Sequence, residues 1–270
     1  MTAFEHLKAA ASSFHAVLVS EGGDRTVFRV QPPEVSGRPG SPYLIAIEEK
    51  GGTLFARELD VKELPAACPE RHINFDGSFC LYWGEAEPLS IDSPEAAHEW
   101  WGKLTIFLLR QRVAGQRHRW PGKAEARAHG PIAARFQARA ETAASVLGVS
   151  FRKTLRRGGF TTARRRRAGE HRIRLLRDGR KIATVIEELR RVMTLRMLCR
   201  CDGASVLRLP LGKCGDHGAV LAEFIIALDG WKRAEEDFFR QATKLGMKCC
   251  GSIDGCPLAE PAAGTHRKAA

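Results

Sequence analysis

The chain has 270 residues, 44% of them hydrophobic and 27% charged, a globular balance that excludes disordered, collagen-like and coiled-coil proteins. Its 43 Lys and Arg against 31 Asp and Glu give a net charge of +12. No run reaches the roughly 18 apolar residues of a membrane span, and the first residues lack the pattern of a secretory signal. We therefore expect a cytoplasmic protein without membrane association, whose eight cysteines are reduced, catalytic or metal-bound.

The first half of the chain alternates helical and strand-like patterns. Apolar residues recur at helical spacing over residues 3–19, and turn residues then separate three short strand-like runs. An irregular segment with a cysteine follows, and residues 82–99 are predicted as a loop. The predicted strands are residues 26–30, 43–47 and 53–57, and the predicted helices are residues 100–112 and 132–147. This order predicts an α+β fold with an antiparallel meander of three or four strands.

The positive charge is concentrated in residues 151–200, which hold 17 Lys and Arg against 4 Asp and Glu. The rest of the chain is close to neutral, and Arg164 to Arg167 form the densest run. Such a block attracts phosphate or an acidic protein surface, so RNA, DNA or an acidic partner is one interpretation. A solvated linker is the other, and we predict a basic linker over residues 149–180.

The second half is predicted to be mainly helical and rich in cysteine, over residues 181–270. An apolar stripe from Ile182 to Met197 fits one helix, residues 219–228 fit a second and residues 231–245 fit a third. We find no internal repeat in this region.

The segment from His72 to Leu81 carries the strongest chemical signal of the chain. A lone cysteine is usually a small buried hydrophobic residue, but Cys80 follows Asp-Gly-Ser, a turn sequence that holds a side chain near the surface. Acyl transfer by a cysteine needs an accessible thiolate and a donor for the developing oxyanion. Asn74 can supply that donor, which supports a nucleophile hypothesis for Cys80.

The order of motifs resembles the ubiquitin-conjugating (E2) family. That family has a His-Pro-Asn motif, a loop ending in Gly-x-x-Cys-Leu and a Trp before a helix reading Leu-Thr-Ile-x-x-x-Leu-Leu. The matching segments here are His72-Ile73-Asn74, Gly77-Ser78-Phe79-Cys80-Leu81 and Trp101-Gly102-Lys103-Leu104-Thr105-Ile106-Phe107-Leu108-Leu109. The resemblance covers residues 1–148, which predicts a UBC-like domain there. It is closest to the divergent bacterial E2-like proteins, which work with ubiquitin-like modifiers and are often linked to antiviral defence.

Three departures from the family pattern concern this loop. Ile73 stands in place of the family's Pro, the gap between Asn74 and Cys80 is two residues shorter, and the segment between Cys80 and Trp101 is longer than in eukaryotic members. The first two bear on whether the Asn74 amide reaches the thioester. The third predicts different contacts with the acceptor or partner.

The resemblance implies a transfer chain. Cys80 would receive a ubiquitin-like protein as a thioester from an E1-like activating enzyme and pass it to an amine of an acceptor protein. The implied catalytic residues are Cys80, Asn74 and His72: Asn74 would steady the loop or stabilise the oxyanion, and His72 would act as a structural hydrogen-bonding group. Either Asp76 or Asp92 could orient the incoming lysine.

The C-terminal cysteines form a second candidate site. Zinc prefers four Cys or His ligands, commonly supplied as close pairs from separate segments, so a structural zinc site is one interpretation. Reduced thiols at helix ends are the other, and Cys68 is predicted to be a packed thiol. The candidate ligands, of which a subset would suffice, are Cys199, Cys201, Cys214, His217, Cys249, Cys250 and Cys256.

The sequence thus leaves three functions open. The first is an E2-like conjugating enzyme with a Cys-rich accessory domain. The second is an inactive E2-fold module that only binds partners. The third is a metal-containing protein that binds nucleic acid through residues 151–200.

Overall fold

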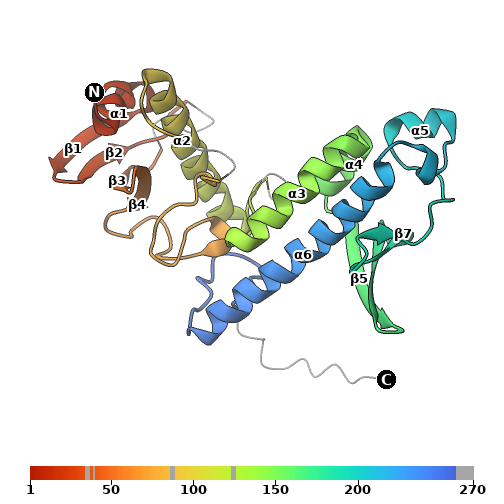
Figure 1. Cartoon of the computed structure of the whole chain (residues 1–270). Helices are drawn as coiled ribbons and strands as arrows, with labels where there is room; N and C mark the ends of the chain where they lie inside the picture. Colours follow the sequence, from red (N-terminus) through yellow and green to blue (C-terminus); the bar gives the residue numbers. More distant parts are fainter. Residues whose placement is uncertain (34–36, 39, 86–88, 123–125, 260–270) are drawn as a thin grey trace. The chain divides into compact units, whose positions relative to one another are not determined.

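The computed structural model describes residues 1–33, 37–38, 40–85, 89–122 and 126–259 (Figure 1). The chain forms two compact units, the first comprising Met1–Pro121 and Gly246–Ala270 and the second Gly122–Leu245. No pattern in the sequence indicated that residues after 245 belong with the first unit. Over the described ranges, no helix is both long and apolar enough to cross a membrane.

The first unit is built around a four-stranded antiparallel sheet in the order β1-β2-β3-β4. Its elements are α1 (Ala3–Ala10), β1 (Ala16–Gly22), β2 (Arg25–Val30), β3 (Tyr43–Lys50), β4 (Thr53–Glu58) and α2 (Pro94–Arg117). The three predicted strands are confirmed as β2, β3 and β4. The structure therefore has the predicted mixture of a meander and helices in its N-terminal part.

The predicted helix over residues 3–19 is wrong in its second half. Helix α1 ends at Ala10, a 3₁₀ turn follows, and His15 then takes a left-handed conformation with φ 55°. Beyond it the apolar run Val17 to Val19 forms the edge strand β1, paired with β2. These branched side chains favour a strand, and their spacing fitted a helical stripe only by coincidence.

Helix α2 begins six residues earlier than predicted, inside the segment expected to be a loop. Ser93 caps it by accepting a hydrogen bond from the Ala96 amide at 3.2 Å, and Pro94 occupies the first turn. A Ser-Pro pair is a known helix-start signal. The serine side chain caps a first-turn amide, and proline lacks an N–H at a position where no acceptor within the helix exists for one.

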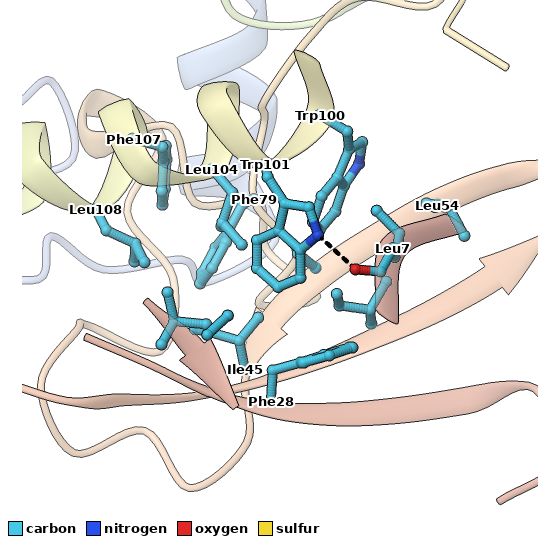
Figure 2. Close-up of a cluster of buried hydrophobic side chains, with 14 of the residues drawn as sticks. Leu7, Phe28, Ile45, Leu54, Phe79, Trp100, Trp101, Leu104, Phe107 and Leu108 are labelled. Carbon is cyan, nitrogen blue, oxygen red and sulfur yellow. Dashed lines mark hydrogen bonds between the residues drawn. The ribbon is translucent and has the colours of Figure 1, made fainter. Parts of the chain in front are cut away.

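Aromatic side chains of α2 form the core of the first unit. Trp100 and Trp101 are fully buried, and the indole N–H of Trp101 donates to the carbonyl of Leu7 in α1 at 2.9 Å (Figure 2). Phe79 stacks on Phe107 with ring centroids 4.6 Å apart. The residue next to Cys80 is therefore anchored in the core.

The second unit combines helices with a second antiparallel sheet, in the order β5-β6-β7-β8. Its elements are α3 (Pro131–Leu147), α4 (Val149–Arg156), β5 (Phe160–Arg167), β6 (Glu170–Arg177), β7 (Arg180–Ile186), β8 (Arg191–Val192), α5 (Asp202–Leu207) and α6 (His217–Lys244). The predicted helix over residues 132–147 is confirmed as α3, which packs along α6.

Residues 149–180 were predicted to be a linker and instead form α4, β5 and β6. The predicted helix from Ile182 to Met197 is also wrong, because β7 and β8 lie in this range. Two-residue turns at Ala168-Gly169 and Asp178-Gly179 join the strands, and all four residues have positive φ. Asp-Gly between strands is a strong hairpin signal. In β6 the apolar residues Ile173 and Leu175 alternate with arginine and are fully buried. The many arginines around them made this strand pattern hard to recognise in the sequence.

Helix α6 runs without a break through Gly230, where the sequence analysis separated two helices. A Cβ at Gly230 would lie 2.6 Å from the ring of Phe136 in α3. The glycine therefore permits a close approach of the two helices and does not end one.

Candidate functional site

Cys80 lies at the end of a small hairpin formed by residues 72–80. The amide of Asn74 donates to the carbonyl of Ser78 at 2.8 Å, and the amide of Gly77 donates to the carbonyl of Asn74 at 3.0 Å. Gly77 has φ 80°, so the turn is a type I turn followed by a left-handed residue. The Cys80 amide closes the other end by donating to the carbonyl of His72 at 2.8 Å.

One face of this hairpin packs against the core, and on the other face Ser78 is itself only 6% exposed. Ile73 and Phe79 pair with one another and are 1% and 6% exposed, so they face the core. The Phe79 amide also donates to the carbonyl of Ala56 in β4 at 2.8 Å. Because side chains alternate along an extended chain, Ser78 and Cys80 point to the opposite face. Cys80 is partly exposed there.

Polar side chains brace the turn before Cys80. The Asn74 amide nitrogen donates to the Ser78 hydroxyl at 3.0 Å, so Asn74 lies on the same face as Cys80. The Ser78 hydroxyl and amide both donate to Asp76, at 2.6 and 3.0 Å. Partial burial would raise the pKa of Asp76, but these two hydrogen bonds outweigh it and the pKa is lowered. The sequence analysis did not give Ser78 this role.

The remaining residues named from the sequence lie apart from this brace. His72 is 9% exposed, has a left-handed backbone with φ 57°, and packs its ring 5.0 Å from that of Trp120. Asp92 is exposed just before the cap of α2. The hairpin thus brings Asn74 and Cys80 to one face, with His72 packed at its base.

A buried arginine attaches the base of the hairpin to α2. Arg71 is 5% exposed, and its guanidinium donates to the side-chain oxygen of Gln111 at 2.7 Å and to the Gln111 carbonyl at 3.0 Å. The Gln111 amide returns a bond of 2.6 Å to the Arg71 carbonyl. Burial lowers the pKa of Arg71. No motif in the sequence pointed to this pair.

Four of the predicted metal ligands converge in the second unit. Cys199, Cys201, Cys214 and His217 offer ligand atoms that all lie within 4.8 Å of one another. Cys201 caps α5, Cys214 ends a 3₁₀ turn and His217 begins α6. Three separate segments of the chain therefore meet at these four side chains.

The spacing of these atoms fits one tetrahedral ion. The Nδ1 of His217 lies 3.4 Å from the sulfur of Cys199 and 3.2 Å from that of Cys214, and the sulfurs of Cys201 and Cys214 are 3.7 Å apart. Zinc–sulfur bonds of about 2.3 Å at tetrahedral angles place ligand atoms roughly 3.5–3.8 Å apart. Three thiols and one imidazole are also a donor set that zinc prefers.

The other three candidate ligands lie in the first unit. Cys250 places its sulfur 2.8 Å from that of Cys68, and burial together with the neighbouring Cys249 thiol raises the pKa of Cys256 to about 11. Among the described residues, the group with metal-ligand geometry does not include Cys249, Cys250 or Cys256.

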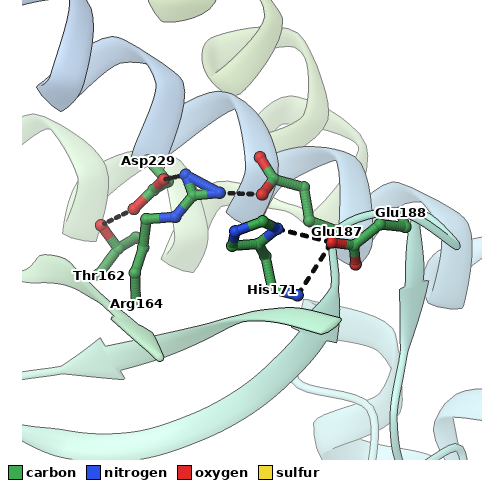
Figure 3. A network of polar contacts seen from close by, with 6 residues as sticks. All are labelled: Thr162, Arg164, His171, Glu187, Glu188 and Asp229. Atoms are coloured by element: carbon green, nitrogen blue, oxygen red, sulfur yellow. Dashed lines mark hydrogen bonds and ion pairs between the residues drawn. The ribbon is translucent and has the colours of Figure 1, made fainter. Parts of the chain in front are cut away.

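The arginine-rich block forms the sheet β5–β8, and Arg164 within it is neutralised by acidic side chains. Asp229 of α6 is 4% exposed, accepts a hydrogen bond of 2.9 Å from Thr162 and pairs with Arg164 at 3.4 Å (Figure 3). Arg164 also pairs with Glu187. The fold therefore provides acidic partners for the positive charge of Arg164.

The end of β5 is different. Arg165, Arg166 and Arg167 are exposed, and within the described part of the chain they make no ion pair or hydrogen bond through their side chains. Arg165 lies directly opposite Arg172 of β6. Like charges in such a position repel one another. Arg172 is paired with Glu170 at 2.8 Å, so the unpaired positive charge at this end is that of Arg165, Arg166 and Arg167.

The geometry defines a protein with a partly exposed cysteine on a hairpin of an α+β unit, followed by a unit with a four-ligand cysteine and histidine cluster. Comparison with family models agrees: residues 14–122 match the prokaryotic E2 domain, and residues 128–258 match the cysteine-rich domain that is C-terminal to the E2 domain. The two matches, in this order along the chain, are those of a divergent bacterial E2-like protein. No curated protein and no solved structure matches it.

Proposed function

We propose that the protein is an E2-like conjugating enzyme that carries a ubiquitin-like modifier as a thioester on Cys80. The observation that carries the proposal is the partly exposed sulfur at the end of a braced hairpin inside the prokaryotic E2 domain. The E2 domain suggests E1-like enzymes and ubiquitin-like proteins as partners. A role in antiviral defence and a location in the cytoplasm stay predictions.

The chemistry proceeds in two acyl transfers. The Cys80 thiolate attacks the thioester carbonyl of the activating enzyme, forming a new C–S bond while the enzyme's own thiolate leaves. An acceptor amine then attacks the Cys80 thioester, the C–N bond forms, and the thiolate of Cys80 leaves and takes up the proton that the amine loses. Both steps develop negative charge on the carbonyl oxygen.

The surrounding residues have separate positioning roles in this proposal. The Asn74 amide uses one N–H for Ser78, so its second N–H is available to an oxyanion at Cys80. Asp76 holds Ser78 and thereby the turn, which argues against Asp76 as the group that orients the lysine. His72 acts through packing, because its ring is buried against Trp120.

The test uses the full chain with a cognate activating enzyme, ATP and a ubiquitin-like modifier, followed by a non-reducing gel. We expect an adduct that dithiothreitol removes, that Cys80→Ala abolishes and that Cys80→Ser converts to a reductant-resistant oxyester. Cys249→Ser is the matched control and should retain the reducible adduct. An adduct that persists in Cys80→Ala would contradict the proposal, and no adduct in any variant would favour the inactive module.

We also propose that Cys199, Cys201, Cys214 and His217 hold a structural zinc ion. The ion would cross-link the loop after β8, α5 and the start of α6. Native mass spectrometry of the purified chain should show one zinc per protein.

A second function has one specific observation in its favour, the exposed and unpaired arginines at the end of β5. We infer that this surface binds a polyanion, and nucleic acid is the candidate to test. Binding of a short labelled duplex should weaken steeply between 50 and 200 mM salt, as counterion release requires. Substitution of Arg165, Arg166 and Arg167 by glutamine should remove most of that binding. Unchanged binding would refute it.

A further inference from the structure

The first unit contains a pair of thiols outside the Cys80 hairpin. Cys68 is 2% exposed and precedes the 3₁₀ turn Pro69–Arg71. Its backbone is fixed by two hydrogen bonds of 3.0 Å with Ile73, one in each direction. The partner, Cys250, is partly exposed in the segment after α6. The sulfur atoms are 2.8 Å apart, with the Cys250 thiol directed at Cys68.

The distance is short for two thiols that only pack together. A disulfide bond is about 2.05 Å long, so these atoms need to approach by less than about 1 Å to form one. A metal site would need further ligands around the pair. Over the described parts of the chain, the residues with metal-ligand geometry do not include either cysteine. A disulfide is therefore the chemistry for which this pair is arranged.

The surroundings favour one thiolate and one thiol. The Ser252 hydroxyl lies 3.0 Å from the Cys250 sulfur and accepts a hydrogen bond of 3.0 Å from the buried guanidinium of Arg71. Its hydrogen bonds with Cys68 and Ser252 lower the pKa of Cys250, and the charge of Arg71 acts in the same direction. The hydrogen bond with Cys250 and burial raise the pKa of Cys68.

The segment that carries Cys250 is held against the first unit by other contacts. The Asp254 amide donates to the carbonyl of His118 at 2.7 Å, next to the end of α2. Ile253 packs with Cys68 and Ala114 in a small apolar cluster. A covalent bond at this point would fasten residues 246–258 to the base of the hairpin, since Cys68 is paired through its backbone with Ile73.

We propose that Cys68 and Cys250 are a redox site, forming a reversible disulfide with hydrogen peroxide as the oxidant. The Cys250 thiolate attacks one peroxide oxygen, giving a sulfenic acid on Cys250 and hydroxide. The Cys68 sulfur then attacks the sulfenic sulfur, the S–S bond forms, and the sulfenic oxygen leaves as water with the Cys68 proton. A small dithiol reverses the reaction by exchange. This site does not depend on Cys80 acting as a carrier.

The test is peptide mapping of the full-length protein. The reduced chain is treated with a slight excess of peroxide, remaining thiols are alkylated, and trypsin is added without reductant. Cleavage places Cys68 in residues 63–71, Cys80 in residues 72–103 and Cys250 in residues 249–267. We expect a linked pair of the first and third peptides that disappears after dithiothreitol.

Two matched variants assign the partner within residues 249–267. Cys249→Ser should keep the link and Cys250→Ser should lose it, with Cys68 then fully alkylated after unfolding. Equal linkage in Cys250→Ser, or a wild-type Cys68 that stays fully alkylatable after peroxide, would overturn the proposal. Native mass spectrometry showing a metal ion that is lost in Cys68→Ser would overturn it as well, because the pair would then be part of a ligand set.

Discussion

Replacing Arg71 by methionine tests whether the buried pair with Gln111 holds the Cys80 hairpin in place. The change leaves the side-chain oxygen of Gln111 buried without its donor, and Gln111 is 1% exposed. Hydrogen bonds to charged groups contribute about 1.5–3 kcal/mol, and a buried orphaned acceptor costs about 1–3 kcal/mol. Burying the Arg71 cation has a cost, which is seen in its lowered pKa. Methionine avoids that cost, which offsets part of the loss. We therefore expect a net loss of about 2–4 kcal/mol in the stability of the first unit.

Tryptophan fluorescence in urea measures this loss. Four of the five tryptophans lie in the first unit, and a Trp231→Phe background removes the signal of the second. Arg25→Met, at an exposed position in β2, is the matched control and should change stability by less than about 0.5 kcal/mol. A double-mutant cycle with Gln111→Leu should show coupling of about 1–2 kcal/mol. Equal effects of the Arg71 and Arg25 changes, or additivity in the cycle, would refute the reasoning.

Three further outcomes are expected. His217→Ala should reduce the zinc content from one ion per chain to near zero by elemental analysis, and a retained ion would contradict the four-ligand site. Gly230→Ala should destabilise the second unit by about 1–3 kcal/mol in a thermal melt, because its Cβ meets Phe136, and Phe136→Leu should recover part of the loss. Asp76→Asn should cost about 1 kcal/mol at pH 7 through its bonds to Ser78. That cost should shrink below about pH 4, since a carboxyl with a lowered pKa stabilises the fold only while ionised.

The sequence predicted the first unit better than the second because its signals are local. Turn residues bound β2, β3 and β4, and apolar spacing marks α2 and α3. In the second sheet, arginine occupies strand positions on both faces, since Arg164 can turn inward only because Asp229 lies beneath it. Asp229 is 65 residues from Arg164 in the sequence, so no pattern near Arg164 could predict this pair. The expected helix break at Gly230 was wrong for a similar reason. The glycine is explained by its contact with the ring of Phe136 in α3, which is distant in the sequence.

The candidate site divides in the same way. Cys80 and Asn74 could be found because the motif lies within one short segment, and the hairpin places them on one face. The brace from Arg71 to Gln111 could not be found, because it joins a turn to a helix 40 residues later without any motif. Of the seven predicted metal ligands, spacing alone could not separate the four that converge from the three that lie in the first unit.

The cysteines show why residue type and spacing leave function undecided. Cys80 lies apart from the other thiols on a hairpin face and is partly exposed there. Three others meet an imidazole at the distances of a tetrahedral ion. The sulfurs of Cys68 and Cys250 are 2.8 Å apart, close enough to form a disulfide when an oxidant removes two electrons. The same thiol is thus available for acyl transfer, metal binding or oxidation according to what surrounds it.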